Sequence, residues 1–298
     1  MHKFLRAAGF ANINKRSELK NILKNVLKNP DEKQYVTMKD DSIAVEYRRD
    51  FSDSVGIAVC GEFSDDAEFD YEFYYPYFRG DFLSSHAEVD LERHLEKETY
   101  AGVFDDGRIG ISIIFFLQNR LDYLKASMKK EFSTLRTDVN LSALAVSGSI
   151  MLPIKKDQKQ IQNYKKDIIN RNNLINAARQ GDEEAMETLT LEDIDTYTAI
   201  SRKILDEDVF SLVDTYLMPY GIESDIYSIL GEILNVWRER NSLTNESIYI
   251  ITLNCNDLVL EVCINKKDLV GEPAKGRRFK GTIWLQGMVD FSVVNPPR

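Results

Sequence analysis

Three side chains, His86, Asp90 and His94, have the types and spacing of metal ligands. Residues 88–97 are expected to form a helix, on which side chains four residues apart lie along one stripe. Ligands on such a stripe spread over about 12 Å, whereas a zinc ion needs its donors within about 2.2 Å. All three therefore cannot hold one ion, although one pair could still join a carboxylate from the preceding segment. The carboxylates considered for that role are Asp65, Asp66 and Asp70.

A second candidate is a basic cluster beside a tryptophan near the C-terminus. After Lys266 and Lys267, the candidate binding surface consists of Lys275, Arg277, Arg278, Lys280 and Trp284. On a strand, Trp284 lies on the face opposite Ile283 and Leu285, so it points outward if those two fill a core. An outward tryptophan among arginines could stack bases or anchor a partner protein. We favour the alternative, in which Trp284 is buried under helices of residues 173–205, because monomers rarely expose large aromatic patches.

The sequence contains no motif for nucleophilic catalysis or phosphate binding. It lacks the G-x-S-x-G turn of serine hydrolases, and no cysteine has an activating histidine near it in the sequence. The segment Gly107–Gly110 lacks the third glycine of a phosphate-binding loop. Cys60, Cys255 and Cys263 form no C-x-x-C pair, and their odd number suits a reducing compartment, so we expect three buried thiols. We expect no metal and no other cofactor.

The acidic residues are concentrated in one segment. From Asp50 to Asp106 there are sixteen carboxylates against three lysines and arginines, whereas the whole chain carries a net charge of -10. Phosphate binding needs positive potential, which argues against nucleic-acid binding by the N-terminal half. We prefer to interpret this segment as a solvated acidic face, and carboxylate catalysis within residues 50–106 is the alternative.

Hydrophobic spacing predicts an N-terminal region of strands and helices. A helix is expected from Ser17 to Asn29, where Pro30 ends it. A meander of strands is then expected over residues 35–39, 42–48, 55–61 and 67–75. After it we expect a hairpin of residues 100–104 and 108–117, a helix over 121–130 and a strand over 141–154.

The last third of the chain predicts a small antiparallel β-barrel. Period-two alternation is found in residues 226–237, 247–253, 258–264 and 282–291. Gly231 allows the first of these strands to bend, and the shape is most like an oligonucleotide/oligosaccharide-binding (OB) barrel. A helical connector is expected before it, with a hinge at Gly181, a cap at Asp182 and a further helix from Thr190 to Leu205.

Together these patterns predict an α+β fold in three parts. They are an antiparallel-sheet domain over residues 1–154, a helical connector over 155–207 and a small OB-like β-barrel over 208–298. The longest apolar run, Ile113–Leu117, is far below the roughly 18 residues that a membrane-spanning helix needs. No signal-peptide core follows Lys3 and Arg6. We therefore expect a cytoplasmic protein without membrane contact.

Four segments of the chain resemble one protein family. They are MHKFLRAAGF at the N-terminus, LTLEDIDTY from Leu189, VDTYLMPYGIESDIYSILGEI from Val213 and GEPAKGRRFKGTIWLQG from Gly271. The family is domain of unknown function 3881 of anaerobic Gram-positive bacteria, and the resemblance covers the whole chain. It implies a cytoplasmic bacterial protein, and it assigns no activity, substrate or catalytic residue.

The sequence favours a non-catalytic cytoplasmic protein that binds a protein partner or a small ligand. Two other functions stay open at this point. One is an enzyme of unknown reaction that uses carboxylates of residues 50–106. The other is single-stranded nucleic-acid binding by the C-terminal barrel, which is less favoured than binding of a protein partner or a small ligand.

Overall fold

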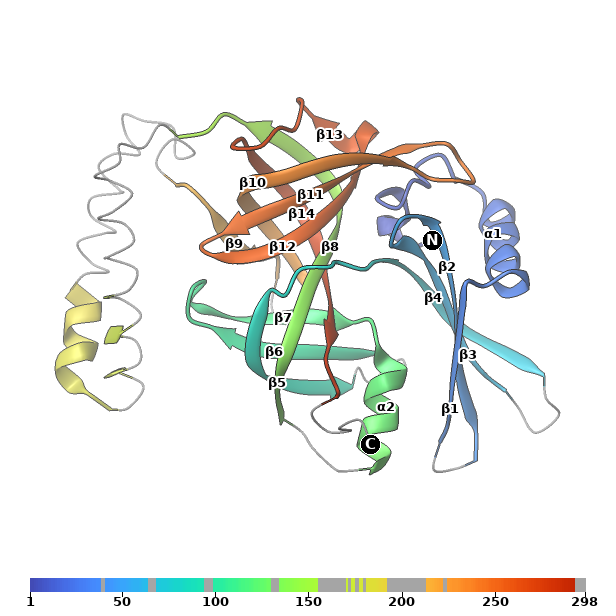
Figure 1. The fold of residues 1–298 in the computed structure, drawn as a ribbon, viewed down its shortest axis with the longest axis horizontal. Helices are drawn as coiled ribbons and strands as arrows, with labels where there is room; N and C mark the ends of the chain where they lie inside the picture. The colour runs from blue at the N-terminus through green and yellow to red at the C-terminus, as the bar shows by residue number, and fades with distance from the viewer. Residues whose placement is uncertain are drawn as a thin grey trace.

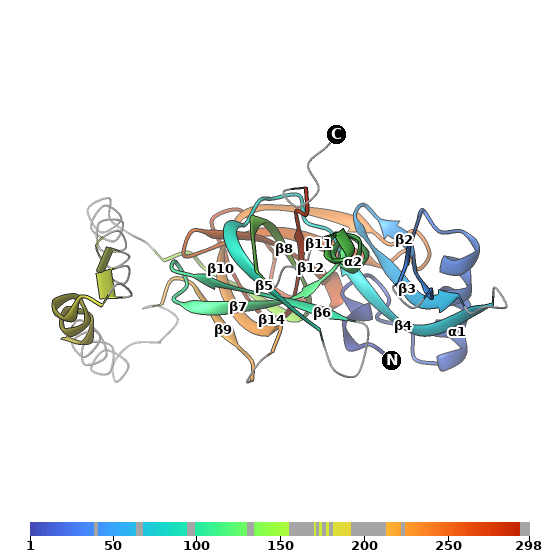
Figure 2. The same ribbon diagram turned by 90° about the horizontal axis from the view of Figure 1, so that it is seen from below.

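The computed structural model describes residues 1–38, 41–63, 68–93, 99–129, 134–154, 170, 173–174, 177–178, 181–191, 213–221 and 224–292. These residues form mainly β-strands with a few helices, and antiparallel pairing predominates, so the fold is α+β as predicted. Figures 1 and 2 show a smaller sheet beside a larger one. Within these residues, no helix combines the length and the apolar character needed to cross a membrane.

The smaller sheet is antiparallel, and its four strands follow sequence order (Figure 1). The strands are β1 (Glu32–Thr37), β2 (Ile43–Ser52), β3 (Val55–Phe63) and β4 (Phe69–Phe78). The 3₁₀ helix η1 (Lys3–Arg6) precedes α1 (Arg16–Lys28), which lies against β2 and β3. Leu19, Ile22 and Val26 form the buried stripe of α1 because they recur at helical spacing. The predicted helix and meander are confirmed.

The larger sheet has ten strands. The strands before residue 152 are β5 (Ser85–Arg93), β6 (Tyr100–Asp106), β7 (Ile111–Leu117) and β8 (Thr134–Met151), with α2 (Arg120–Lys129) between the last two. The later elements are β9 (Tyr216–Pro219), β10 (Ile226–Arg240), β11 (Ser247–Cys255), β12 (Leu258–Asn265), η2 (Lys266–Asp268), β13 (Leu269–Val270) and β14 (Arg278–Val289). The predicted β6–β7 hairpin, helix α2 and C-terminal strands are confirmed.

The ladders of this sheet close into two five-stranded circuits. One runs β8-β5-β6-β7-β14 and the other runs β8-β12-β11-β10-β14, and each returns from β14 to β8. In the first circuit β7 pairs parallel with β14, and in the second β12 pairs parallel with β8. The remaining ladders of both circuits are antiparallel. The two circuits therefore share the β8–β14 ladder. From β8 to β14 in the first circuit, and from β14 to β8 in the second, three antiparallel ladders are followed by one parallel ladder.

In each circuit, one phenylalanine ring packs against glycines of neighbouring strands. A Cβ on Gly102 or Gly287 would lie 2.1 or 2.5 Å from ring atoms of Phe115. A Cβ on Gly148 would lie 2.4 Å from the ring of Phe279. Both phenylalanines are fully buried, so the missing side chains of these glycines permit close packing of the core.

The ladders also cross the boundaries predicted for the domains. Strand β8 lies in the predicted N-terminal domain, yet it pairs with β12 and β14 and completes the second circuit. The strands of residues 208–298 therefore close around a strand from outside that range. The division into 1–154, 155–207 and 208–298 stays a prediction.

Part of the predicted connector lies within the described residues. Residues 183–191 form a helix after Gly181, whose φ is 89°. Asp182 caps this helix, because its Oδ1 accepts a hydrogen bond from the N–H of Ala185 at 3.1 Å, as predicted. Most of the helix expected from Thr190 to Leu205 lies outside the described residues.

The helix expected over residues 88–97 is wrong. In β5, Val89 and Leu91 are buried and alternate with exposed charged side chains. Charges that recur every four residues are compatible with both a helix and a strand. Pairing with β8 and β6 shows that these residues form a strand. Residues 94–97 lie outside the described residues.

Candidate functional site

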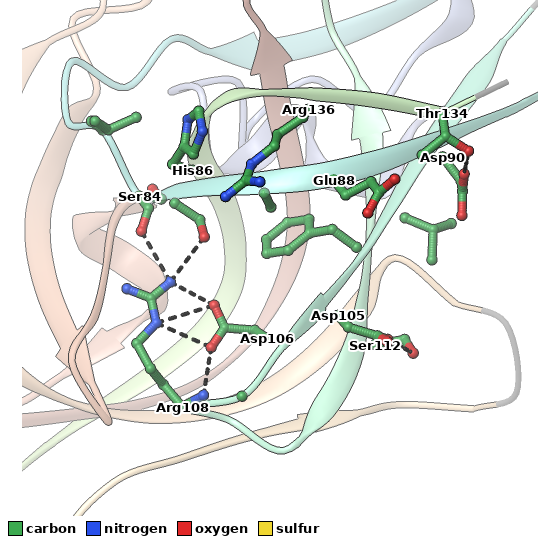
Figure 3. Close-up of a pocket in the computed structure, with 16 residues that line it drawn as sticks. Ser84, His86, Glu88, Asp90, Asp105, Asp106, Arg108, Ser112, Thr134 and Arg136 are labelled. Atoms are coloured by element: carbon green, nitrogen blue, oxygen red, sulfur yellow. Dashed lines mark hydrogen bonds and ion pairs between the residues drawn. The ribbon is translucent and has the colours of Figure 1, made fainter. Parts of the chain in front are cut away.

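A groove opens where β5 and β6 separate. These strands pair only between Asp90–Arg93 and Tyr100–Val103. Beyond that ladder, β5 continues to pair with β8, and β6 continues to pair with β7. The groove has a volume of about 1170 Å³, and both separating strands line it (Figure 3).

Arg108 forms one end of the groove. It lies in the turn between β6 and β7, and its Nη2 donates to Asp106 Oδ2 at 2.5 Å. The same nitrogen donates to the carbonyl of Ser84 and the hydroxyl of Ser85, both at 3.2 Å. Arg108 therefore connects the end of β6 to the start of β5, as Figure 3 shows. A guanidinium suits this role because its five donors lie in a rigid plane.

Polar side chains cover the outer face of the β5–β8 ladder. His86 Nδ1 lies 2.8 Å from Asp138 Oδ1, and Thr134 donates a hydrogen bond to Asp90. Between these two contacts, Glu88 is the register partner of Arg136. Neither the carboxylate of Glu88 nor the guanidinium of Arg136 forms a hydrogen bond or an ion pair within the described part of the chain.

The unpaired charges of Arg136 and Glu88 distinguish a basic and an acidic end of the groove, because Arg108 at the basic end is already paired with Asp106. Figure 3 shows the guanidinium of Arg136 directed toward the side of His86 and Arg108. The carboxylate of Glu88 is directed the opposite way, toward Asp90. The guanidinium of Arg136 can therefore receive an anion at one end, and the carboxylate of Glu88 can receive a cation at the other.

The structure separates the residues of the expected metal stripe. His86 and Asp90 lie four residues apart on a strand, which corresponds to about 13 Å. His86 contacts Asp138 instead, and Asp70 lies on β4 of the other sheet. His94, Asp65 and Asp66 lie outside the described residues. Among the residues that are described, no group of three histidine, cysteine or acidic side chains could hold a metal ion.

Two members of the basic surface are buried. Trp284 is 5% exposed, and its ring lies 5.4 Å from Phe4 and 5.1 Å from Phe116 between centroids. Its Nε1 donates to Asp225 Oδ2 at 2.7 Å. Arg278 is 7% exposed and donates to the carbonyls of Leu152 and Val213. Trp284 is therefore buried, but the ring contacts that the structure describes come from the N-terminal segment and Phe116, and most of residues 173–205, the expected cover, lie outside the described residues.

The other three basic residues differ in their contacts. Arg277 Nη1 donates to the carbonyl of Glu272 at 2.7 Å. Lys275 is exposed and Lys280 is half-buried. These three side chains are therefore not joined to an exposed tryptophan, and stacking of bases on Trp284 would require it to leave its buried position.

The three cysteines are buried and form no disulfide, as expected. Burial raises the pKa of the Cys255 thiol to about 12 and raises the pKa of Cys60 and Cys263 well above the ordinary value. A thiolate is the reactive form of cysteine, so none of the three is prepared for nucleophilic attack.

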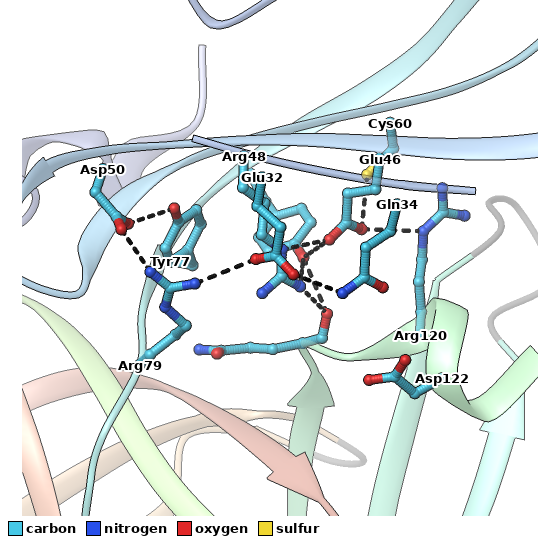
Figure 4. A network of polar contacts seen from close by, with 12 residues as sticks. Glu32, Gln34, Glu46, Arg48, Asp50, Cys60, Tyr77, Arg79, Arg120 and Asp122 are labelled. Atoms are coloured by element: carbon cyan, nitrogen blue, oxygen red, sulfur yellow. Dashed lines mark hydrogen bonds and ion pairs between the residues drawn. The ribbon is translucent and has the colours of Figure 1, made fainter. Parts of the chain in front are cut away.

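A second polar cluster lies between the smaller sheet and α2 (Figure 4). At its centre, Glu46 of β2 accepts from Arg48 Nε at 2.5 Å and from Arg120 Nε at 3.3 Å. Cys60 Sγ donates at 3.3 Å to Glu46 Oε2, the oxygen that also accepts from Arg120. Burial alone would raise the pKa of Glu46, but Arg48 and Arg120 outweigh it and hold the pKa below its ordinary value. This cluster joins the two sheets, and its paired charges leave no carboxylate for a ligand.

Sequence reasoning missed Arg108, Arg136 and Glu88 as a set. A signal existed in the alternation of buried Leu135, Thr137 and Val139 with polar residues, which marks a strand that begins at Thr134 and not at residue 141. The end of the β5–β6 ladder has no comparable local signal. Both strands line the groove because β5 pairs with β8 and β6 pairs with β7 beyond that point, and these pairings join residues distant in the sequence.

A model of one protein family matches residues 5–287, and its description is "Domain of unknown function, E. rectale Gene description (DUF3881)". The matched range contains every residue that lines the groove. Comparison with curated proteins and with solved structures gives no match.

Proposed function

We propose that this chain, which belongs to the family described as domain of unknown function DUF3881, is a non-catalytic protein that binds a small ligand in the groove between β5 and β6. One observation carries the proposal. Glu88 and Arg136 face the groove from opposite positions of the β5–β8 ladder, and neither side chain forms an ion pair or a hydrogen bond within the described residues. Ligand sites are concave and contain a few polar groups that fix the orientation of the ligand, and this groove combines a concave surface with these two charges.

The chemistry of Arg136 supports recognition of an anionic group. A guanidinium can donate two parallel hydrogen bonds to a carboxylate or phosphate, which fixes both position and orientation. Arg108 is already held by Asp106 and by Ser84, so it shapes the groove. Arg136 is the cation that a ligand can engage without breaking a contact within the described chain.

Co-purification tests this proposal directly. Purified protein should be denatured, and the released small molecules should be analysed by mass spectrometry. We expect a polar molecule to be enriched with the wild type and lost with Arg136→Gln. The matched control is Arg16→Gln on α1, which removes an exposed arginine far from the groove. Equal recovery from wild type and Arg136→Gln would contradict binding in the groove.

A second candidate function is an enzyme that uses carboxylates. The groove brings together Glu88, Asp90, Asp105 and Asp106, all from residues 50–106. Paired carboxylates can act as acid and base when their protonation states differ. Incubation of the released molecule with fresh protein separates the two functions, because an enzyme changes its mass and a binding protein returns it unchanged.

We infer that the second circuit is an OB-like barrel, since its five strands close through one parallel ladder between β12 and β8. OB barrels bind oligonucleotides on the face of their second and third strands, which correspond to β11 and β12 when β10 is counted first. Ile248, Ile250 and Cys263 occupy that face here and are buried against the N-terminal segment. Their burial argues against nucleic-acid binding there, and an absence of any salt-dependent shift with an oligonucleotide would agree.

We also propose a cytoplasmic location in an anaerobic Gram-positive bacterium, without membrane contact. The family description names E. rectale, and three cysteines without a disulfide suit a reducing compartment. Cell fractionation tests this location, and recovery from the medium or the envelope would contradict it. A protein partner remains a further interaction to test, by capture from native lysate with Arg136→Gln as the comparison.

A further inference from the structure

The groove offers backbone groups as well as charges. Where β5 leaves β6, residues 85–89 are still paired with β8 on one side. Their other side faces the groove, beyond the end of the β5–β6 ladder at Asp90. Strand edges of this kind donate and accept main-chain hydrogen bonds with an added extended chain. A ligand that contains amide groups therefore matches the wall of the groove.

The two ends of the groove set the charges of such a ligand. The basic end, with Arg136 directed toward it, receives a carboxylate, and the acidic end, with Glu88 and Asp90, receives an ammonium group. A ligand rich in phosphate would meet repulsion from the acidic end. A ligand with amines only would leave Arg136 without a partner, and a neutral sugar would leave both ends unpaired.

The dimensions set the length of the ligand. From the contact of His86 with Asp138 to the contact of Thr134 with Asp90 the ladder advances four residues, or about 13 Å. An extended chain of three residues spans about 10 Å. Glu88 and Arg136 start from one register position midway along this ladder and are directed toward its two ends, so three residues place one terminal charge on each side of that position.

We propose that the ligand class is a short peptide with free termini, about three residues long, which lies extended along β5 with its carboxylate at Arg136 and its ammonium group at Glu88. This inference rests on the proposed function and makes it specific. Asp90 adds negative charge at the ammonium end, although it already accepts a hydrogen bond from Thr134.

Calorimetric titration with trialanine tests the inference. The probes are Ala-Ala-Ala, its N-acetylated form, its C-terminal amide and the doubly capped form. Removal of either terminal charge should weaken binding to the wild type at least about tenfold, because hydrogen bonds to charged groups exceed neutral ones by that order. The doubly capped peptide should bind weakest.

Two variants assign the ends of the peptide. In Arg136→Gln, the free peptide should bind as weakly as its amide, because the carboxylate has lost its partner. In Glu88→Gln, the free peptide should bind as weakly as its acetylated form. Arg16→Gln and Glu187→Gln remove exposed charges elsewhere and should bind all four peptides like the wild type.

Three results would overturn the inference. They are equal binding of capped and free peptides, an effect of Arg136→Gln on the amide as large as on the free peptide, and no binding of trialanine. If trialanine fails while a co-purified molecule still depends on Arg136, the peptide is wrong and the ligand site stands. If neither the peptide nor any co-purified molecule depends on Arg136, both proposals are wrong.

Discussion

The groove and the cluster around Glu46 contain similar side chains in opposite states. In the cluster, Glu46 is buried between two arginines, which are nearly inaccessible to solvent (Figure 4). In the groove, Glu88 and Arg136 are exposed and directed apart, although the ladder sets them opposite each other (Figure 3). The first arrangement stabilises the contact of the two sheets, and the second leaves charge available to a ligand.

The difference shows why charge composition alone could not locate a site. Both regions contain arginine and carboxylate, although Glu46 lies outside the acidic segment of residues 50–106 and the carboxylates of the groove lie within it. A buried ion pair that loses one partner leaves a desolvated charge, whereas an exposed charge that loses its neighbour is still hydrated. Substitutions in the Glu46 cluster should therefore lower the stability of the fold, whereas substitutions of Glu88 or Arg136 should weaken ligand binding and leave stability unchanged.

The largest effect is expected from Glu46→Gln. It leaves Arg48 and Arg120 buried without their carboxylate, which should lower the free energy of unfolding by about 3–5 kcal/mol. Urea unfolding measures this change, with Glu187→Gln as the exposed control. A loss below about 1 kcal/mol would show that the Glu46 cluster does not hold the two sheets together, and it would contradict the stabilising role given to these buried charges.

Acid should remove part of the same stabilisation. The pKa of Glu46 is lower in the folded protein than in the unfolded chain, so its contribution is complete above the unfolded pKa and is lost as the pH falls through the folded one. The free energy of unfolding of the wild type should therefore fall below about pH 4.5 more steeply than that of Glu46→Gln. Parallel pH profiles for the two proteins would contradict the paired state of this carboxylate.

An intermediate effect is expected from Arg108→Ala. The carboxylate of Asp106 is buried and loses its guanidinium partner, while backbone N–H groups still donate to it. Hydrogen bonds to a charged group contribute about 1.5–3 kcal/mol, and unfolding of Arg108→Ala in urea should show a loss in that range. Arg16→Ala is the control. A change under about 0.5 kcal/mol would mean that Arg108 does not hold the end of the groove.

The parts of the fold that were predicted depend on local patterns. The buried stripe of α1 and the alternation in β10 to β12 are complete within each segment, so the sequence is enough to identify them. Strand β5 was mistaken for a helix because its charges fit both periods. The alternation of side chains along a strand predicts which face Trp284 lies on. Its burial against Phe4 could not be predicted in this way, because Phe4 is distant in the sequence.

The groove itself was out of reach for the same reason. It exists because the β5–β6 ladder stops at Asp90 while β5 continues along β8, and the position of that stop is a property of the whole sheet. The sequence identified residues 50–106 as chemically distinctive, and four carboxylates of the groove come from it. Arg136 was missed because the extent of β8 was underestimated, and Arg108 was missed because its contacts with Ser84 and Ser85 join segments that are distant in the sequence.

Unfolding of the double variant Glu88→Gln, Arg136→Gln with and without trialanine tests the central claim most directly. Without peptide, the variant should unfold within about 0.5 kcal/mol of the wild type, because these exposed charges do not stabilise the fold. With peptide at a hundredfold excess over its dissociation constant, the wild type should gain about 2.7 kcal/mol and the variant should gain far less. A variant that is strongly destabilised without peptide, or that gains as much as the wild type, would contradict a groove whose charges serve a ligand.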